Sequence, residues 1–334
     1  MKQRGVTPVQ TSREASTAFR SVAGVDCLDP VHESDPESAR WVKGEIERLI
    51  SLVDELAPTR DEPEPGVVEA FYSSPGLRAW SETIPSAAAL WPLYNAHAGV
   101  LHDGRPLDEV ASAFFRHCLD ARGIRSRGAV TQQLLRDILA GSKNTDSMKW
   151  ASLACGAAEA VCPVVSDAIG LGLDVTVDLV DRDPVALALS MQTAESVGCA
   201  SAIRTVELDV LRLRELVSTL GEAVYDVVDI LGFFEYLPTD PPDGWVGASD
   251  FLAACYRMLA PGGHLVMANM LDTHPQLPFT LHAVRWPYIQ PRPLEELGVI
   301  IERAGIPLSA VDVLLPADGV YAVLRIEKPA ESLS

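Results

Sequence analysis

Residues 148–184 read MKWASLACGAAEAVCPVVSDAIGLGLDVTVDLVDRDP, and this stretch decides the fold of the chain. A short apolar run, Trp150 to Cys155, leads into a turn of small residues, and an Ala- and Val-rich helical segment follows. A second β-rich run, Val175 to Val180, ends at Asp181. In a doubly wound sheet the ligand lies over the carboxyl ends of such strands, and an acid that ends the second strand can bond ribose hydroxyls. The stretch therefore predicts a strand–helix–strand unit with Asp181 in a ligand site.

The turn after the first strand departs from the glycine-rich pattern of dinucleotide-binding proteins. It has one glycine, Gly156, followed by Ala-Ala-Glu where that pattern has further glycines. Small residues let a ligand approach the backbone closely. A carboxylate at the start of a helix, here Glu159, repels a pyrophosphate but favours a ligand with a cationic group. We therefore expect this turn to bind a ligand that carries a positive charge.

From about residue 148 onward, apolar runs of strand type alternate with helical segments. Strands are expected near 149–154, 175–180, 203–207, 225–230, 263–269, 308–315 and 319–326, and helices near 157–170, 184–197, 210–219, 246–260 and 292–304. This alternation implies a mainly parallel sheet with helices on both faces. Only Pro316-Ala-Asp-Gly319 separates the last two strands, which forces an antiparallel hairpin because a parallel return needs a long crossover. The chain is thus predicted to be an α/β protein with a Rossmann-like sheet of seven mostly parallel strands.

The residues before this sheet show helical periodicity instead. Ser34-Asp-Pro-Glu37 offers a helix start, and apolar residues follow at three- and four-residue steps from Trp41 to Leu56. Further helices are expected near 67–73, 76–83, 86–98, 107–121 and 128–141. Residues 1–33 are polar, without clear periodicity, and are expected to be mobile at least in part. The predicted parts are a mobile segment 1–33, an all-helical N-terminal cap or lid 34–128, and a ligand-binding Rossmann-like domain 129–334.

The composition limits the partners that the protein can have. Over 334 residues the formal net charge is −19 and no run of Lys and Arg occurs, so nucleic acids and anionic membrane surfaces are disfavoured. The six cysteines form no C-x-x-C pair, which predicts free thiols in a reducing cytosol and no metal site. The first ten residues do not read as a signal peptide, and no apolar run reaches 18 residues. We expect a cytoplasmic protein that acts on a small-molecule substrate, and the sequence leaves homodimerisation open.

Five motifs in chain order resemble those of the class I S-adenosylmethionine (SAM) dependent methyltransferases. They are Ser152–Glu159 (SLACGAAE), Asp181, Asp209, the fourth-strand run Tyr225–Ile230, and Arg257–Val266 with its L-x-P-G-G turn. The first motif keeps Cys155-Gly156 but has Ala158 in place of the family's last glycine, and it lacks the family's early acid. The resemblance implies the seven-stranded methyltransferase sheet, with SAM as cofactor.

The same resemblance implies which residues bind SAM. The backbone at Gly156 and Ala157 would approach the amino acid part of the cofactor. Asp181 would accept hydrogen bonds from the ribose diol, and Asp209 with the backbone of Val210 would hold the adenine edge. Carboxylates and aromatic faces nearby favour the sulfonium charge. The implied cofactor-binding residues are Ala154, Gly156, Ala157, Glu159, Asp181, Arg182, Asp209, Val210, Leu231 and Gly232.

The segment after the fourth strand, Leu231–Leu237, reads LGFFEYL and bears on the acceptor. Methyltransferases that modify amino groups and bases often carry Asn-Pro-Pro-Tyr or Asp-Pro-Pro-Tyr there, and this chain does not. The segment is similar instead to the GLFDYL stretch of bacterial enzymes that make 3-hydroxy-fatty-acid methyl esters. Ile124–Gly128, Leu153–Gly156 and Gly319–Ile326 fit the same subgroup. This resemblance implies methyl transfer to a carboxylate or hydroxyl oxygen of a small molecule, in specialised metabolism.

Several polar and aromatic residues are candidates for catalysis or for binding the acceptor. The catalytic candidates are Tyr94, Asn95 and His97 in the helical part, and Glu235 and Tyr236 after the fourth strand. The substrate-binding candidates are Tyr72, Arg125, Phe233 and Asn269. Arg125 and Arg127 can pair a substrate carboxylate bidentately, or they can pair surface acids. The polar residues of the helical part can instead form a buried network that fixes the cap.

Two other functions remain open from the sequence. Attack at another carbon of the sulfonium would transfer or cyclise the aminocarboxypropyl arm and release methylthioadenosine, as in nicotianamine-synthase-like and azetidine-forming enzymes. The altered first motif, the absence of Asn-Pro-Pro-Tyr and the helical cap all permit this chemistry. The chain can also be a SAM-binding regulator without catalysis, in which case the cap would leave no cavity for an acceptor.

Overall fold

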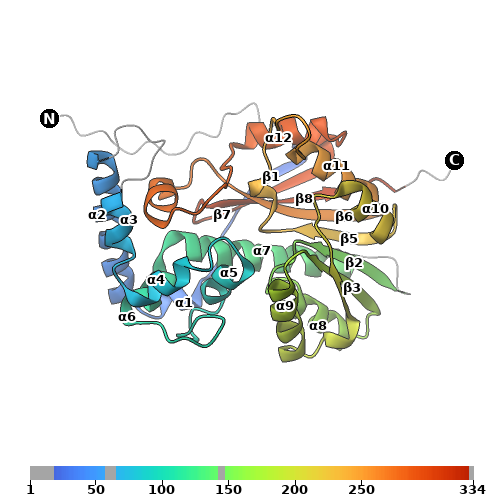
Figure 1. The fold of residues 1–334 in the computed structure, drawn as a ribbon. Helices are drawn as coiled ribbons and strands as arrows, with labels where there is room; N and C mark the ends of the chain where they lie inside the picture. The colour runs from blue at the N-terminus through green and yellow to red at the C-terminus, as the bar shows by residue number, and fades with distance from the viewer. Residues whose placement is uncertain (1–18, 57–64, 142–146, 331–334) are drawn as a thin grey trace.

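The computed structural model describes residues 19–56, 65–141 and 147–330, which form one eight-stranded sheet with helices on both faces (Figure 1). The strand order is β1-β7-β8-β6-β5-β2-β3-β4. All of these strands run parallel except β8, which is antiparallel to both of its neighbours. The predicted α/β class with a mostly parallel, Rossmann-like sheet is confirmed, and the sheet has one strand more than the seven predicted.

The central strands are joined by helices, as the alternating pattern predicts. The strands are β2 (Met148–Leu153), β3 (Val175–Asp181), β4 (Ile203–Glu207), β5 (Tyr225–Ile230) and β6 (Leu259–Met270). The helices are α8 (Cys162–Gly170), α9 (Pro184–Ser196), α10 (Leu213–Leu220), α11 (Ala248–Met258) and α12 (Leu294–Arg303), with short turns η2 (Ala200–Ala202), η3 (Phe234–Tyr236) and η5 (Leu308–Ala310). Helix α8 begins five residues later than the predicted 157, because a turn occupies the residues between β2 and α8.

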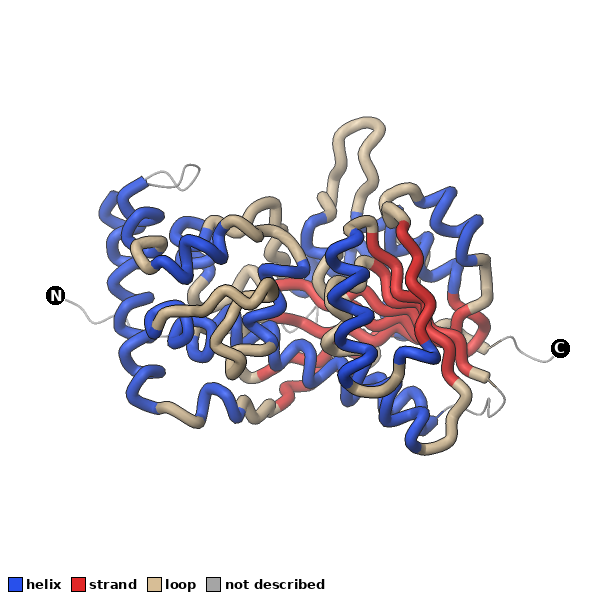
Figure 2. Tube along the Cα trace, turned by 60° about the horizontal axis from the view of Figure 1, so that its bottom comes forward, coloured by secondary structure: helices blue, strands red, loops and turns tan. Residues whose placement is uncertain are grey.

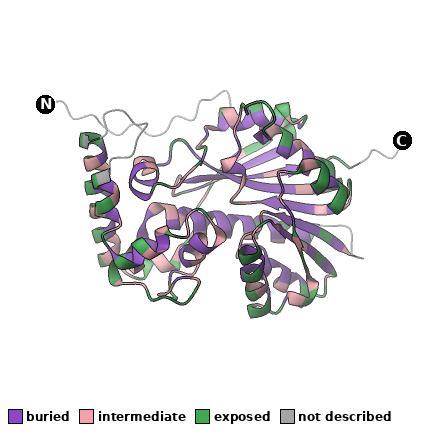
Figure 3. Ribbon diagram, in the orientation of Figure 1, coloured by how far each residue is buried: buried purple, intermediate pink, exposed green. Residues whose placement is uncertain are grey.

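Two hydrophobic clusters fill the space between the sheet and the helices. On one face, α10, α11 and α12 cover Val228 of β5 and Leu265 of β6. On the other face, α8, α9 and α7 (Leu119–Gly141) cover the alternate positions Val227 and Val266. Strands buried on both faces are nearly continuous apolar runs, and Figure 3 shows the central strands buried along most of their length. Both faces of the sheet are therefore covered, which leaves the ends of the strands as the place for a ligand.

The carboxyl-terminal part of the sheet contains the predicted hairpin and an additional strand. β7 (Val311–Pro316) and β8 (Tyr321–Glu327) pair antiparallel, as expected from the short turn between them. The additional strand, β1 (Ser21–Val25), pairs in parallel with β7 and is followed by α1 (Pro30–Glu33). Both elements belong to the segment 1–33, for which we expected mobility, and residues 1–18 of that segment lie outside the described residues. β1 escapes prediction because it has five residues with mostly exposed side chains and no apolar alternation.

A cluster of charged residues around Asp312 of β7 holds β1 to the sheet. Arg20 donates from Nε to Oδ1 at 2.8 Å, and the hydroxyl of Ser21 donates at 2.7 Å. Arg325 of β8 donates from Nη2 to Oδ2 at 2.6 Å. The hydrogen bond from Arg20, together with those from Arg325 and Ser21, holds the pKa of the Asp312 carboxyl well below its usual range. Arg20 and Ser21 lie at the opposite end of the sequence from Asp312, so no local pattern could reveal that β1 pairs with β7.

The N-terminal helices form a cap beside one end of the sheet (Figures 1 and 2). They are α2 (Pro36–Leu56), α3 (Pro65–Phe71), α4 (Pro75–Ser81), α5 (Ala87–Tyr94) and α6 (Glu109–His117). The two helices expected at 107–121 and 128–141 are instead α6 and the continuous α7, which starts at Leu119. Helix α7 runs through the predicted domain boundary at residue 128, and the division of the chain into domains stays a prediction. The core of the cap also takes in Tyr321 and a π-helical turn, η4 (Phe279–Val284), that the sequence did not predict.

Asp312→Asn is expected to lower the free energy of unfolding by about 1–3 kcal/mol at neutral pH, because a charged acceptor shared by two guanidinium groups is lost. The pKa of Asp312 is depressed in the folded state, so its contribution is present above the unfolded pKa of about 3.9 and disappears as the pH falls through the folded value. Urea unfolding at pH 7 and at lower pH measures both effects. Asp54→Asn, at an exposed position of α2, is the matched control and should change little. Equal stability of the Asp312 variant and the wild type at pH 7 would contradict this role.

Candidate functional site

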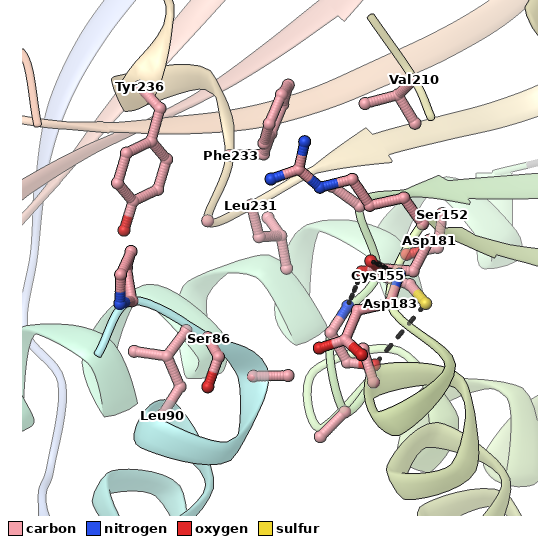
Figure 4. A pocket seen from close by; sticks show the side chains of 18 of the residues that line it. Ser86, Leu90, Ser152, Cys155, Asp181, Asp183, Val210, Leu231, Phe233 and Tyr236 are labelled. Atoms are coloured by element: carbon pink, nitrogen blue, oxygen red, sulfur yellow. Dashed lines mark hydrogen bonds between the residues drawn. The ribbon is translucent and has the colours of Figure 1, made fainter. Parts of the chain in front are cut away.

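A cavity of about 800 Å³ lies over the carboxyl ends of β2, β3, β4 and β5, with α5 on its opposite side. In the close view of Figure 4, Ser86 and Leu90 of the α5 region face Phe233 and Tyr236, which follow β5. The crevice outside the carboxyl ends of parallel strands is the usual ligand site of such sheets. All ten residues expected to bind the cofactor line this cavity: Ala154, Gly156, Ala157, Glu159, Asp181, Arg182, Asp209, Val210, Leu231 and Gly232.

The loop after β2 forms the floor of the cavity and has an unusual backbone. Its alternate residues Ala154, Gly156 and Ala158 have φ values of 48°, 55° and 52°. This left-handed region is open to glycine but costs an alanine about 1–2 kcal/mol. A Cβ atom added to Gly156 would lie 3.5 Å from the side chain of Ala87 in α5. The floor is therefore a tight coil of small residues, and the cap closes directly over it.

Asp181, the last residue of β3, ties this loop to the neighbouring strand. Its Oδ2 accepts a hydrogen bond from the backbone N–H of Gly156 at 3.1 Å, and its Oδ1 accepts from the N–H of Asp183 at 3.0 Å (Figure 4). Burial raises the pKa of this carboxyl above its usual value, although the two backbone hydrogen bonds act in the opposite direction. A carboxylate has about four acceptor positions. Asp181 thus keeps acceptor capacity for a ligand in the cavity.

Asp209 follows β4, the neighbour of β3 at the edge of the sheet. Its Oδ1 accepts from the N–H of Leu211 at 3.0 Å, and its Oδ2 lies 3.9 Å from Nη1 of Arg182. The Arg182 side chain is largely exposed, with a relative exposure of 72%. Asp181 and Asp209 therefore stand at the ends of adjacent strands, with the arginine at the outer rim of the cavity.

Asp229 of β5 is a lining residue that the sequence reasoning did not select. Its carboxylate accepts from Trp150 Nε1 at 2.6 Å and from the Ser152 hydroxyl at 2.9 Å. Burial raises its pKa to about 7, against the effect of these two hydrogen bonds. The sequence does contain a signal for this residue, because Asp229 is an acid inside the apolar run 225–230. A carboxylate within a buried strand needs polar partners or a function.

Helix α5 is fixed to the floor by polar and apolar contacts. Asn95, which ends α5, donates from Nδ2 to Oε1 of Glu159 at 2.7 Å. Ala88 of α5 packs with Ala157 of the loop and Leu189 of α9 in a small buried cluster. Burial raises the pKa of the Glu159 carboxyl, and the hydrogen bond from Asn95 partly offsets this. The carboxylate expected to face a cationic ligand thus also holds the cap.

The five predicted catalytic residues are not all at the cavity. Tyr94 and Tyr236 line it. Asn95 is outside the lining and acts on it through Glu159, and the side chain of His97 is exposed to solvent. Glu235 is buried behind the wall, where its Oε2 accepts from the N–H of Met270 at 3.2 Å. Helix α5 ends at Tyr94, and Asn95–His97 form the turn that follows, so the run Tyr94–His97 does not present its side chains to one site.

Among the predicted substrate-binding residues, Phe233 lines the cavity and the other three do not. The Tyr72 hydroxyl donates to the carbonyl of Val284 at 2.6 Å and joins α3 to η4. Arg125 pairs with Asp29 at 2.8 Å and donates to three backbone carbonyls around α6. Asn269 is buried in β6, where its side chain bonds two backbone carbonyls and Arg292. Each of these side chains has its hydrogen-bonding partners within the protein.

The charge of the cavity is mainly negative. Five carboxylates and two guanidinium groups line it, from Glu159, Asp181, Asp183, Asp209, Asp229, Arg127 and Arg182. Such a surplus favours a cationic ligand. Within 19–56, 65–141 and 147–330, no group of three or more His, Cys, Asp or Glu side chains is arranged to hold a metal ion. Over the same residues, no helix combines the length and the apolar character that a membrane span requires.

Comparison of the chain with protein-family models and with curated proteins gives no match. Among solved structures, a possible exported protein from Bordetella parapertussis is similar over 89% of this chain and 99% of its own, with a TM-score of 0.61 and 16% identity. The CMeT domain of the citrinin polyketide synthase has a TM-score of 0.48 and 12% identity over 86% of this chain and 80% of its own. Magnesium protoporphyrin IX methyltransferase from Synechocystis PCC 6803 has a TM-score of 0.47 and 12% identity over 79% of this chain and 96% of its own. The first likeness supports the fold, and the other two are too distant to support a conclusion.

Ala154→Gly is expected to stabilise the protein by roughly 0.5–1 kcal/mol, because relief of the left-handed strain outweighs the extra freedom of the unfolded chain. The measurement is the free energy of unfolding in urea. Ala157→Gly is the matched control, since Ala157 is not among the residues with positive φ, and this change should be neutral or destabilising. If both variants shift stability in the same direction and by the same amount, the backbone of the loop is not strained as described.

Proposed function

We propose that the protein is a SAM-dependent enzyme of the class I methyltransferase type that transfers a methyl group to an oxygen atom of a small molecule. The observation that carries this proposal is the joint placement of the coiled loop Ala154–Ala158, Asp181 and Asp209 around one cavity of about 800 Å³. The three features come from the ends of β2, β3 and β4, in the order of the motifs that resemble this family.

The residues of the cavity suit each part of SAM. Asp181 has acceptor positions free for the ribose hydroxyls, and Asp209 beside it can accept from the adenine amino group. The absence of a side chain at Gly156 leaves the backbone accessible to the methionine part. The carboxyl pKa values of Glu159 and Asp229 are raised by burial, and a bound ammonium or sulfonium would lower them again. The binding of a cation therefore relieves the cost of burying these carboxylates.

Methyl transfer depends mainly on holding the acceptor oxygen in line with the methyl group and the sulfur atom. The bond between the methyl carbon and sulfur breaks as the oxygen–carbon bond forms, and the electron pair of the broken bond stays on sulfur to give S-adenosylhomocysteine. A carboxylate acceptor yields an ester without releasing a proton, whereas a hydroxyl acceptor loses one. Tyr94 lines the cavity from the cap and Tyr236 lines it from the segment after β5, and we assign to them the orientation of the acceptor oxygen.

The finer parts of the proposal rest on the segment LGFFEYL after β5. Its likeness to enzymes that make 3-hydroxy-fatty-acid methyl esters supports an oxygen acceptor and a role in specialised metabolism. We further propose that the cap, residues 34–128, acts as the lid over a SAM-binding part, 129–334, in a cytoplasmic protein. The contact of Ala87 with the loop supports the lid, because the cap then covers the reacting groups.

Product analysis tests the proposal against its alternatives. The full chain is incubated with SAM and candidate acceptors, and the products are separated by mass. Acceptor-dependent S-adenosylhomocysteine is the expected result. Methylthioadenosine formed without an acceptor would show chemistry on the aminocarboxypropyl arm. Binding of SAM without any product would indicate a regulator, and no binding of SAM would refute the proposal.

Asp181→Ala is expected to weaken SAM binding by roughly ten- to a hundredfold, because a charged acceptor for two hydroxyls is lost at about 1.5–3 kcal/mol. Isothermal titration calorimetry measures the affinity, and Asp181→Asn should show a smaller loss. Glu207→Ala is the matched control, because Glu207 pairs with Asp181 across β3 and β4 but its side chain is exposed outside the cavity lining. Unchanged SAM affinity in Asp181→Ala would remove this residue from the cofactor site.

Tyr94→Phe is expected to reduce turnover about tenfold while SAM affinity stays within about twofold, because its hydroxyl acts on the acceptor as it approaches. Steady-state kinetics and calorimetry with SAM give the two quantities. His97→Ala is the control, since its exposed side chain lies outside the cavity lining. Equal turnover of the Tyr94 variant and the wild type would show that Tyr94 only shapes the wall.

A further inference from the structure

Arg127 of α7 is a buried guanidinium that lines two adjoining cavities. Its side chain has a relative exposure of 2%. It lines the large cavity and also a smaller one of about 40 Å³, which lies under the cap. Leu90, Gly232, Tyr236 and Trp286 line both cavities as well. Arg127 therefore stands at the junction between the proposed cofactor site and the interior of the cap.

The polar atoms of Arg127 have few partners. Its Nε is buried without a hydrogen-bond partner among the described residues. Its Nη2 lies 3.5 Å from the Tyr94 hydroxyl, and its Nη1 lies 3.7 Å from Oε1 of Glu235. The guanidinium carbon lies 4.5 Å from the centre of the Tyr321 ring. A guanidinium carries five N–H donors and stays charged in proteins, so this one is left short of acceptors.

Two other arginines of the same region show how this protein satisfies a buried guanidinium. Arg125, two residues earlier on α7, bonds Asp29 through Nε at 3.1 Å and Nη2 at 2.8 Å, with backbone carbonyls as further acceptors. Arg292 bonds Asn269 at 2.7 Å, Thr239 at 3.1 Å and the carbonyl of Leu237. These arginines hold the structure together. Arg127 is more buried than Arg125 and about as buried as Arg292, yet it lacks comparable bonds, and an unpaired buried charge is costly.

Glu235 does not account for Arg127 as a structural counter-ion. Burial raises the pKa of Glu235 to about 7, and the charge of Arg127 lowers it only in part. A carboxylate placed to neutralise an arginine accepts bidentate hydrogen bonds at about 2.7–2.9 Å, whereas these two groups are 3.7 Å apart. The other acid near the smaller cavity, Asp120, is engaged by Thr280 at 2.8 Å and His274 at 2.9 Å. An acceptor for Arg127 is therefore still required.

The strand order places Arg127 at the end of the large cavity that is distant from Asp181 and Asp209. Asp209 and Asp181 follow β4 and β3, at one edge of the sheet, and Gly156 follows β2. Arg127 contacts residues beyond β5: Glu235 in the loop that follows it, and Tyr321 at the start of β8, opposite Met270 of β6. The nucleoside end and the arginine are thus separated along the sheet by β2 and β5.

We propose that Arg127 binds the carboxylate of the methyl acceptor, which makes the acceptor a small organic acid with an apolar body. This inference rests on the proposed function and names its substrate class. The forked N–H groups of Arg127 match a carboxylate bidentately. The smaller cavity beside it is lined by aromatic rings, among them Phe115, Phe279 and Trp286, and takes an apolar end of the acid.

The test compares acids with neutral analogues of the same shape. Hexanoate, octanoate and 3-phenylpropionate are titrated by calorimetry into the full chain with S-adenosylhomocysteine present, each beside its primary amide. We expect at least one acid to bind at least tenfold more tightly than its amide in the wild type. Arg127→Met should abolish this preference, and Arg127→Lys should keep part of it, because lysine retains the charge without the fork. Arg136→Met, at a partly exposed position of the same helix outside both cavities, is the control and should keep the full preference.

The outcomes separate this inference from the proposed function. SAM and S-adenosylhomocysteine are titrated on their own, and the acid–amide pairs are also measured without them. If SAM does not bind, the proposed function is refuted. The preference for an acid over its amide can still be measured in that case, from the titrations without SAM or S-adenosylhomocysteine. The inference is overturned if no acid is preferred over its amide by the wild type, or if Arg127→Met keeps the preference. It is also overturned if Arg127→Met loses SAM affinity instead, because Arg127 would then be a ligand of the cofactor. Thermal unfolding of both Arg127 variants shows that they are folded.

Discussion

The site depends on one hydrogen bond, from the backbone N–H of Gly156 to the carboxylate of Asp181 at 3.1 Å. It joins the coiled loop after β2 to the end of β3 and so fixes the distance between the floor of the cavity and its acidic edge. The loop holds three left-handed residues, two of them alanines, and such a backbone persists only where its surroundings determine it. Two contacts from the cap hold the loop in this conformation: Ala88 packs against Ala157, and Asn95 donates a hydrogen bond to Glu159.

The cap and the sheet are consequently parts of one packed structure. The core of the cap includes Met270 and Tyr321, which end β6 and begin β8, together with Phe279 of η4. Helix α7 packs under the sheet at its carboxyl-terminal part and against α5 and α6 at its start. The cap and the sheet therefore form facing walls of the cavity above the strand ends. Protein on both sides lowers the local dielectric constant relative to bulk water, which strengthens electrostatic interactions between the walls.

Buried charges in and around this cavity serve two different purposes. Arg125 and Arg292 are surrounded by acceptors and act as cross-links between elements. Burial raises the pKa values of the Asp229 and Glu235 carboxyls to about 7. A cation that binds nearby would lower these pKa values and favour the charged carboxylates. Arg127 lacks close acceptors. The contrast indicates that Arg125 and Arg292 stabilise the fold. Asp229, Glu235 and Arg127 can still form favourable interactions with a ligand.

The sequence by itself determined the β/α alternation, the carboxyl-terminal hairpin and the positions of Gly156 and Asp181, because hydrophobic periodicity and turn residues are local signals. It did not reveal β1, whose attachment depends on Arg20 and Asp312 at opposite ends of the chain. The choice between Arg125 and Arg127 was likewise beyond the sequence. Both are arginines on one helix, two residues apart, and their side chains point to different surroundings because a helix turns about 100° per residue. Only the packing of α7 against the cap and the sheet decided which guanidinium is paired and which faces the cavity.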